Sequence, residues 1–267
     1  MKKGFLFTLA LVLVLSLAAC GSVPGGTGGS EEESELIVFA AASMFGVLLE
    51  IADLFEAANP GVTIIYNFDS SGTLRTQIQE GAAADVFVSA ATREMEQLEE
   101  GGFVVAESRI DFLENQTVLV VAPDNPRDIH GFEDMAAALL AGDTLLAMGN
   151  MDVPVGRYAQ EILTYLGLDH ETLAQTGVIS YGSNVREVAT QVREASVDMG
   201  LVYLTDAVDF GLEVAAIATP EMAGRVIYPA ALLLASQNQV PALAFLDFLV
   251  SDEAMAVFLA WGFTPFY

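Results

Sequence analysis

The feature that most constrains the fold is a repeated change of hydrophobic period along the chain. Continuous apolar runs of strand length alternate with segments in which apolar residues recur every three or four positions. A continuous run predicts a strand covered on both faces, and the longer period predicts an amphipathic helix. Repeated alternation of the two predicts an α/β fold, with mainly parallel sheets that carry helices on both faces.

The first pair of elements illustrates the pattern. Leu36 to Ala42 is an unbroken apolar strand, and the next segment places Val47, Ile51 and Phe55 on one helical face before Pro60-Gly61 ends it. The same reasoning predicts further strands at 62–68, 85–90, 117–122, 144–148, 178–181, 199–204 and 226–235. It predicts further helices at 73–80, 92–100, 132–141, 157–166, 185–195, 241–249 and 252–261.

The N-terminus is typical of an export signal. Lys2 and Lys3 precede an apolar run, residues 5–19, which is shorter than the roughly 20 residues that a membrane-spanning helix needs. The run ends in Leu-Ala-Ala-Cys, which resembles the lipobox of bacterial lipoproteins. We therefore expect a signal peptide at 1–19, lipidation of Cys20, and a flexible Gly/Ser/Glu tether at 20–35. The alternative is an ordinary signal peptide with an incidental cysteine.

Composition narrows the class of protein. The chain has one cysteine, so neither an intramolecular disulfide nor a thiolate metal site can form. About 230 residues follow the tether, enough for one large domain or two lobes. The formal net charge of −26 argues against nucleic acid and anionic membrane surfaces as partners. We expect contact with a membrane through the lipid anchor only.

The junctions between strands and helices carry the candidate binding chemistry. In open α/β sheets, ligands bind beyond the carboxyl ends of the strands, where helix N-termini converge. Junctions at 40–44, 68–73, 153–157, 182–186 and 202–206 offer free backbone N–H groups. Ser43, placed at a helix N-cap, Ser71 and Tyr203 add hydroxyls, and such groups hold an anion without a cationic side chain. The simpler interpretation is that Ser43 and Ser71 are ordinary helix caps.

These segments also resemble a known family, the molybdate-binding proteins of ABC importers. The resemblance covers residues 36–267 and is carried by 38–43 (VFAAAS), 70–74, 81–90 (GAAADVFVSA), 117–123, 153–158, 200–207 and 262–264. It implies a two-lobed periplasmic-binding-protein-like fold of type II with the ligand between the lobes. Lobe 1 would comprise 36–117 and 226–267, and lobe 2 would comprise 118–225, with crossovers near 117–123 and 226–235 that act as hinges.

The resemblance also implies the ligand set. A tetrahedral oxyanion, molybdate or tungstate, would be held by the hydroxyls of Ser43, Ser71 and Tyr203 and by the backbone at Val155 and Val185. No cofactor and no cation site are implied. The partners would be the membrane permease subunits of an ABC importer, and the protein would be an extracytoplasmic, membrane-anchored monomer.

Two residues depart from the family pattern. Gly72 stands where a serine is common, which we expect to loosen a secondary contact with the ligand. Ala83 replaces a usual proline, at a position that should not touch the ligand.

Other function classes lack the residues that they need. The sequence contains no Gly-x-Ser-x-Gly elbow, no phosphate-binding Gly-x-x-x-x-Gly-Lys, no HExxH and no cysteine placed as a nucleophile, so we expect no enzyme. His130 and His170 lie in polar, turn-like stretches away from the junctions and are not expected to bind metal. Arg157 and Arg186 lie beside two proposed contacts, where we expect them to pair with surface carboxylates.

Rival ligands remain open from the residues alone. A cation or iron carrier needs converging carboxylates, His or Tyr, and a sugar or polyamine carrier needs aromatic walls, for which only Tyr203 and Tyr158 qualify. Phosphate keeps a proton near neutral pH and favours a site with an acceptor, whereas a site of donors suits a fully ionised dianion. Molybdate, tungstate and sulfate all satisfy this, and only the family resemblance selects molybdate.

Overall fold

The computed structural model describes residues 34–266, which belong to one compact unit. The expected signal peptide, the lipidation site Cys20 and most of the tether lie outside these residues. Among residues 34–266, no helix is both long enough and apolar enough to cross a lipid bilayer.

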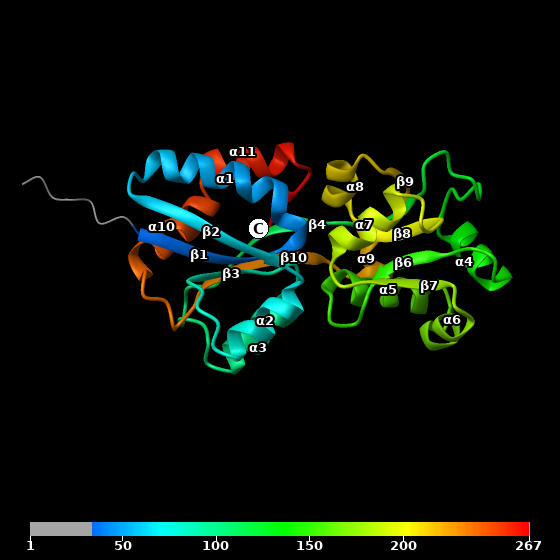
Figure 1. Cartoon of the computed structure of the whole chain (residues 1–267), viewed down its shortest axis with the longest axis horizontal. Coiled ribbons are helices and arrows are strands. Elements are labelled where there is room, and N and C mark those ends of the chain that lie inside the picture. Colours follow the sequence, from blue (N-terminus) through cyan, green and yellow to red (C-terminus); the bar gives the residue numbers. More distant parts are fainter. Residues whose placement is uncertain (1–33, 267) are drawn as a thin grey trace, which may run out of the picture. The chain divides into compact units, whose positions relative to one another are not determined.

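Two sheets organise the described residues (Figure 1). The first has the order β11-β4-β10-β3-β1-β2, and the second has the order β7-β6-β8-β5-β9. The strands of the first sheet are β1 (Ser34–Ala41), β2 (Val62–Asp69), β3 (Val86–Val88), β4 (Ile110–Asn115), β10 (Val226–Leu232) and β11 (Thr264–Pro265). The strands of the second sheet are β5 (Thr117–Val121), β6 (Leu146–Gly149), β7 (Ile179–Gly182), β8 (Met199–Tyr203) and β9 (Glu213–Ile217).

Helices cover both faces of each sheet. On the first sheet, α1, α10 and α11 lie on one face and α2 and α3 on the other (Figure 1). The helices are η1 (a 3-10 turn, Ala42–Met44), α1 (Phe45–Ala58), α2 (Ser71–Gln79), α3 (Thr92–Glu100), α4 (Phe132–Ala141), α5 (Pro154–Tyr165), α6 (His170–Thr176), α7 (Val185–Arg193), α8 (Leu204–Phe210), α9 (Pro220–Ala223), α10 (Gln239–Leu249) and α11 (Asp252–Ala260). The α/β fold expected from the alternating periods is therefore confirmed.

The first strand shows why its apolar run is continuous. Leu36, Val38 and Ala40 pack into the core beneath α1 and α10, while Phe39 faces the opposite core with side chains of α2 and α3. Each of these four side chains is at most 5% exposed. Because neither face of the strand meets water, alternation of polar and apolar residues is absent.

Strand direction differs in part from the prediction of mainly parallel sheets. Strand β1 pairs parallel with β2 and β3, and β6 pairs parallel with β7 and β8. Strand β10 runs antiparallel to both of its neighbours, as does β5. Both sheets are therefore mixed. In each sheet the antiparallel strand is the one by which the chain arrives from the other sheet: β5 enters the second sheet, and β10 re-enters the first.

The two segments that connect the sheets are short. Each lies just before the crossover expected from the sequence, near 117–123 and 226–235. The chain leaves β4 at Asn115 and enters β5 at Thr117, and it returns between Ile217 and Val226. Residues 117–121 and 226–232, expected as crossovers, are strands. Thr117, expected with the first lobe, starts a strand of the second sheet.

The sequence reasoning missed several short elements, among them β4, β9 and α6. Strand β4 (IDFLEN) mixes polar and apolar residues without a clear period, and β9 (EVAAI) is short and rich in alanine, which has low strand propensity. In these two strands tertiary packing, rather than a local pattern, decides the structure. Helix α6 spans only seven residues, with Leu173 as its one buried side chain, but it has a local start signal in the Asp169 cap and a local stop signal in Gly177.

Candidate functional site

A small cavity lies where ends of both sheets meet. Its volume is about 10 Å³, close to the smallest space that holds one water molecule. The lining residues are Ala41, Ala42, Ser43, Ser70, Ser71, Ala90, Val153, Pro154, Val155, Val185 and Tyr203. All five residues expected to contact a ligand, Ser43, Ser71, Val155, Val185 and Tyr203, are therefore brought to one place.

Ser71 is the first residue of α2 and not its cap. Ser70 takes the capping role, because its hydroxyl accepts the N–H of Thr73 at 3.1 Å. The Ser71 Oγ accepts the backbone N–H of Ala90 at 2.9 Å in a buried contact. Since an amide N–H only donates, the Ser71 hydroxyl proton is left to donate to another group.

Ser43 is not the helix N-cap that the sequence predicted. The chain makes the 3-10 turn η1 after β1, so Ser43 lies inside this turn, and α1 begins after Met44 without a side-chain cap. The Ser43 Oγ instead lies 2.9 Å from the Tyr228 hydroxyl, in a buried hydrogen bond between residues 185 positions apart. Ser43 is thus tied to the neighbouring part of the first sheet.

Val155 and Val185 contribute backbone from the first turns of α5 and α7. Pro154 starts α5, and the Asn184 side chain caps α7 by accepting the N–H of Glu187 at 3.1 Å. N–H groups in the first turn of a helix have no acceptor within the helix. Together with the positive end of each helix dipole, they favour a negative charge in the cavity.

Tyr203 supplies a hydroxyl that is buried without a hydrogen-bond partner among residues 34–266. The side chain ends β8 and is 1% exposed. Burial, with the nearby Tyr228 second, raises the pKa of Tyr203 well above its usual value, so the hydroxyl stays protonated. An unpartnered buried hydroxyl that lines a cavity is available to bind a polar ligand or a water molecule.

The two arginines near the cavity are already paired. Arg157 donates to Glu94 at 2.7 Å, and Arg186 donates to Asp209 at 2.6 Å. The Glu94 side chain is 1% exposed, so the expectation of a surface partner was wrong for Arg157: its partner is a buried carboxylate on α3. These ion pairs leave the cavity with neutral donors rather than with net positive charge.

Asp206 is a functional feature that the sequence reasoning missed. It lies in the first turn of α8, is 1% exposed, and neither carboxyl oxygen has a hydrogen-bond partner among the described residues. Burial raises the pKa of Asp206 to about 8, against the smaller opposing effect of Arg186. At neutral pH the carboxyl is therefore mostly protonated, and it adds little negative charge close to Tyr203.

At Gly72, helix α2 comes very close to the loop between β6 and α5. A Cβ built at Gly72 would lie 2.0 Å from the carbonyl oxygen of Asp152, in the loop between β6 and α5. Only a glycine lets this loop come so near to the first turn of α2. Gly72 therefore permits this contact directly beside Ser71, which lines the cavity.

Both histidines form hydrogen bonds with other side chains, and neither lines the cavity. His130 contacts Asp128 at 2.8 Å, and His170 contacts the hydroxyl of Tyr181 at 2.8 Å. Over residues 34–266, no group of three or more His, Cys, Asp or Glu side chains is arranged to hold a metal ion.

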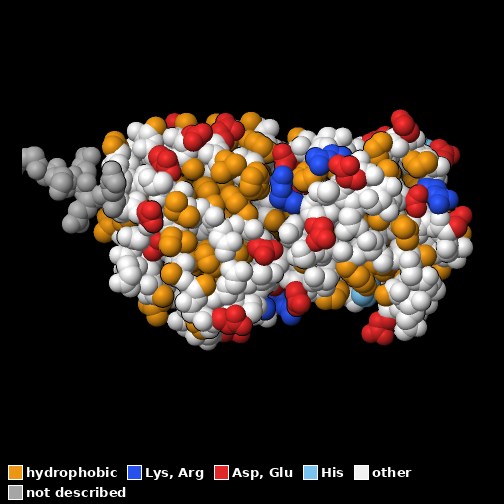
Figure 2. All heavy atoms as spheres, viewed as in Figure 1, with side chains coloured by type: hydrophobic (Ala, Val, Ile, Leu, Met, Phe, Trp, Pro, Cys, Tyr) orange, Lys and Arg blue, Asp and Glu red, His pale blue; other side chains and the backbone are white. Residues whose placement is uncertain are grey.

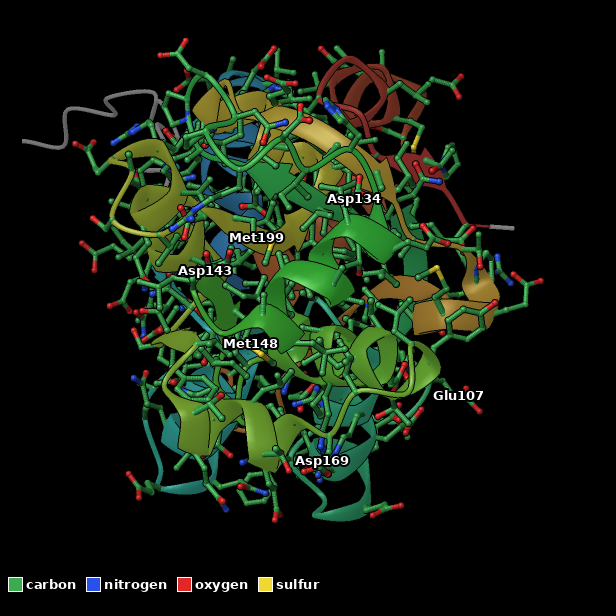
Figure 3. All side chains as sticks on the ribbon, turned by 90° about the vertical axis from the view of Figure 1, so that its right-hand side faces the viewer. Glu107, Asp134, Asp143, Met148, Asp169 and Met199 are labelled. Atoms are coloured by element: carbon green, nitrogen blue, oxygen red, sulfur yellow. The ribbon has the colours of Figure 1, made fainter. Side chains whose placement is uncertain are left out.

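The acidic residues lie mainly on the surface. Figure 2 shows carboxylates spread over one face, with the basic side chains of that face lying close to acidic ones. Asp134, Asp143 and Asp169 are exposed, whereas Met148 and Met199, labelled with them in Figure 3, are buried. No carboxylate is among the residues that line the cavity.

Comparisons with known proteins give matches over most of the described residues. Residues 36–264 match the family described as "Bacterial extracellular solute-binding protein". A Bacillus subtilis (strain 168) relative, "Putative ABC transporter substrate-binding lipoprotein YvgL", is 34% identical over 265 residues, 98% of each chain. "Molybdate-binding protein ModA" of Mycobacterium tuberculosis (strain ATCC 25618 / H37Rv) is 32% identical over 240 residues, 88% of this chain and 87% of the relative. The periplasmic molybdate-binding protein of Azotobacter vinelandii has the same fold, with a TM-score of 0.75 at 22% identity over 86% of this chain and 98% of that chain.

Replacement of the buried carboxyl should change how stability depends on pH. The folded state keeps the Asp206 proton up to about pH 8, whereas the unfolded chain releases it near 3.8. The stability that this raised pKa contributes is complete below the unfolded value and is lost as pH rises to about 8. Between pH 5 and 8, the wild type should lose up to roughly 4 kcal/mol more unfolding free energy than Asp206→Asn.

Urea unfolding at the two pH values measures this difference. Asp247→Asn, which removes an exposed carboxyl, serves as the control and should follow the wild type. Equal pH dependence in Asp206→Asn and the wild type would show that Asp206 is ionised in the folded protein.

Proposed function

Because the chain belongs to the family of bacterial extracellular solute-binding proteins, we propose that it captures molybdate or tungstate and delivers the anion to the permease of an ABC importer. Proteins of this class bind their solute without converting it, so the chain is a binding protein and not an enzyme, and it needs no cofactor. The finer assignment rests on the chemistry of the cavity and on the relatives.

The observation that carries the proposal is the donor set of the cavity. Tyr203 offers an unpartnered buried hydroxyl, and Ser71 has its oxygen occupied by the N–H of Ala90, so its proton is available. Val155 and Val185 add N–H groups at helix N-termini. Because every member of this set can donate and none is a carboxylate, it suits a small anion that carries no proton of its own.

The lining of the cavity argues against sugars and polyamines. Tyr203 is the one aromatic side chain among the lining residues, and no carboxylate is among them. The cavity measures about 10 Å³, room for about one water molecule, so a tetrahedral oxyanion also needs the two lobes to part before it enters. Sulfate remains the alternative, because it is also a compact dianion; molybdate is preferred because relatives above 30% identity bear that ligand in their names.

We further propose that the two sheets and their helices are the two lobes, 36–117 with 226–267 and 118–225. Sheet membership supports this division except at Thr117, which begins a strand of the second sheet and moves the boundary to Gln116. The two passages, at Gln116 and between Ile217 and Val226, are then the hinges about which the lobes close on the anion.

Membrane attachment is proposed through Cys20, which lies outside the described residues. The Bacillus subtilis relative, named as a lipoprotein, aligns over 98% of this chain. Cys20→Ala should release the protein from the membrane fraction of an exporting host, while the unchanged chain stays with it. Detergent-free fractionation and immunoblotting measure this, and equal release of both forms would contradict lipid anchoring.

Calorimetric titration tests the ligand directly. Residues 35–267 should bind molybdate and tungstate with one-to-one stoichiometry, and excess sulfate should leave the molybdate affinity unchanged. Equal competition by sulfate would move the assignment to sulfate. Tight binding of calcium, ferric iron or putrescine would refute the oxyanion assignment.

Removal of either serine hydroxyl should weaken the binding of molybdate. Ser43→Ala and Ser71→Ala should each cost roughly 1.5–3 kcal/mol of binding free energy, the scale of a hydrogen bond to a charged group. Calorimetry gives the affinities, and Ser196→Ala, at an exposed position, is the control. Unchanged affinity in both cavity variants would place the site elsewhere.

A side chain at Gly72 should prevent tight closure. Because the added Cβ would meet the Asp152 carbonyl at 2.0 Å, Gly72→Ala must push the β6–α5 loop away from α2. We expect molybdate affinity to fall about tenfold or more, equivalent to about 1.4 kcal/mol. Gln79→Ala, at an exposed position of the same helix, should bind normally. Full affinity in Gly72→Ala would mean that the anion is held without this close approach.

A further inference from the structure

A buried chain of hydrogen bonds leads away from Ser43. The Ser43 hydroxyl contacts the Tyr228 hydroxyl at 2.9 Å, and Tyr228 Oη receives Asn115 Nδ2 at 3.3 Å. Asn115 Nδ2 also donates to Thr205 Oγ1 at 2.8 Å. The four residues come from η1, β10, β4 and α8, and each is at most 9% exposed. This series of hydrogen bonds therefore connects strands β4 and β10 of the first sheet, and helix α8 next to the second sheet, to Ser43 in the cavity wall.

The orientation of the Asn115 amide is fixed by the backbone. The N–H of Gln116 donates to Asn115 Oδ1 at 2.8 Å. Because a backbone N–H cannot accept, the atom facing it must be the amide oxygen, which decides an assignment that is otherwise ambiguous. The amide nitrogen, which only donates, then faces Thr205 and Tyr228.

This orientation sets the direction of the next hydrogen bond. Tyr228 Oη accepts from Asn115, so its single proton needs another acceptor. Among the described residues, Ser43 Oγ is the remaining hydrogen-bonding neighbour of Tyr228 Oη. A buried hydroxyl proton without an acceptor is destabilising, so Tyr228 donates and Ser43 Oγ accepts.

This direction of the Tyr228–Ser43 hydrogen bond determines where the Ser43 hydroxyl proton can point. With Ser43 Oγ accepting from Tyr228, its own proton is free to point into the cavity that it lines. Ser71 is in the same state, because its oxygen accepts the N–H of Ala90. The backbone N–H of Ala90 therefore orients the Ser71 hydroxyl. The Ser43 hydroxyl is oriented by the series of hydrogen bonds from Asn115 through Tyr228, called the relay below. Burial raises the pKa of Tyr228 well above its usual value, which keeps the donating proton in place.

We propose that Tyr228, oriented by Asn115, is a positioning residue that directs the hydroxyl proton of Ser43 at the bound oxyanion. The inference rests on the proposed function, because it assumes that Ser43 contacts the anion. Tyr228 itself does not line the cavity and acts through Ser43.

A double-mutant cycle tests this proposal. Molybdate affinity is measured by calorimetry on residues 35–267 for the wild type, Ser43→Ala, Tyr228→Phe and the double variant. Loss of the Tyr228 hydroxyl frees a rotor with three staggered positions and removes the polarisation of Ser43, so we expect affinity to fall about 3- to 10-fold. In the Ser43→Ala background, Tyr228→Phe should change affinity by less than about twofold, since the group through which it acts is gone.

A merely structural role for Tyr228 would give a different result. If the losses of the two single variants multiply in the double variant, or if Tyr228→Phe binds as tightly as the wild type, the relay is wrong while the anion site stands. If Ser43→Ala binds as tightly as the wild type, the proposed site fails and the relay fails with it. The matched control is Tyr66→Phe, which removes a hydroxyl that donates to the Leu48 carbonyl and should leave affinity unchanged.

A second variant applies if Tyr228→Phe does not fold. Asn115→Asp replaces the donating amide nitrogen with an acceptor, so the Tyr228 proton turns to the carboxylate and the Ser43 proton turns from the cavity to Tyr228. The loss of molybdate affinity should be at least about threefold larger in the wild-type background than in the Ser43→Ala background. Repulsion between the new carboxylate and the anion is common to both backgrounds, so equal losses would overturn the relay.

Discussion

Binding an anion with neutral donors alone is the constraint on which the rest of the site depends. The first turns of α5 and α7 and the hydroxyl of Tyr203 supply hydrogen atoms without adding formal charge. Both nearby arginines are neutralised by Glu94 and Asp209. Asp206, the buried carboxyl beside this set, is kept mostly protonated by desolvation. The local field is thus set by oriented dipoles, even though the chain has a net charge of −26.

The arrangement of the two sheets makes such a site possible. Strand–helix junctions of both sheets converge on one cavity, so donors from distant parts of the chain line the same small space. Passages as short as the single residue Gln116 join the sheets without a long flexible connection. The glycine at position 72 lets the β6–α5 loop approach α2, which keeps the cavity small. Size and donor geometry are therefore consequences of the same packing.

Selectivity also depends on where individual protons point. A hydroxyl is both donor and acceptor, so a serine by itself does not distinguish a dianion from an anion that retains a proton. The N–H of Ala90 occupies the oxygen of Ser71, and on the proposed relay Tyr228 occupies that of Ser43. With one hydrogen bond accepted by each oxygen, both serine protons are available to donate into the cavity. A fully ionised dianion suits these donors better than an anion that retains a proton.

The sequence by itself determined the α/β class, most of the strands and helices, and, through the resemblance, the five residues that the structure brings to one cavity. The hydrophobic period and the Ser, Gly and Pro residues at the ends of elements carry that information, because their effects on the backbone are confined to a few neighbouring residues. Tertiary structure alone decided that β5 and β10 run antiparallel, that β4 and β9 are strands, and that Ser43 lies in a 3-10 turn. It also placed Tyr228 185 positions from Ser43 yet within hydrogen-bonding distance, and buried Asp206 deeply enough to hold a proton. These outcomes depend on contacts between distant segments and on desolvation, which leave no period in the sequence.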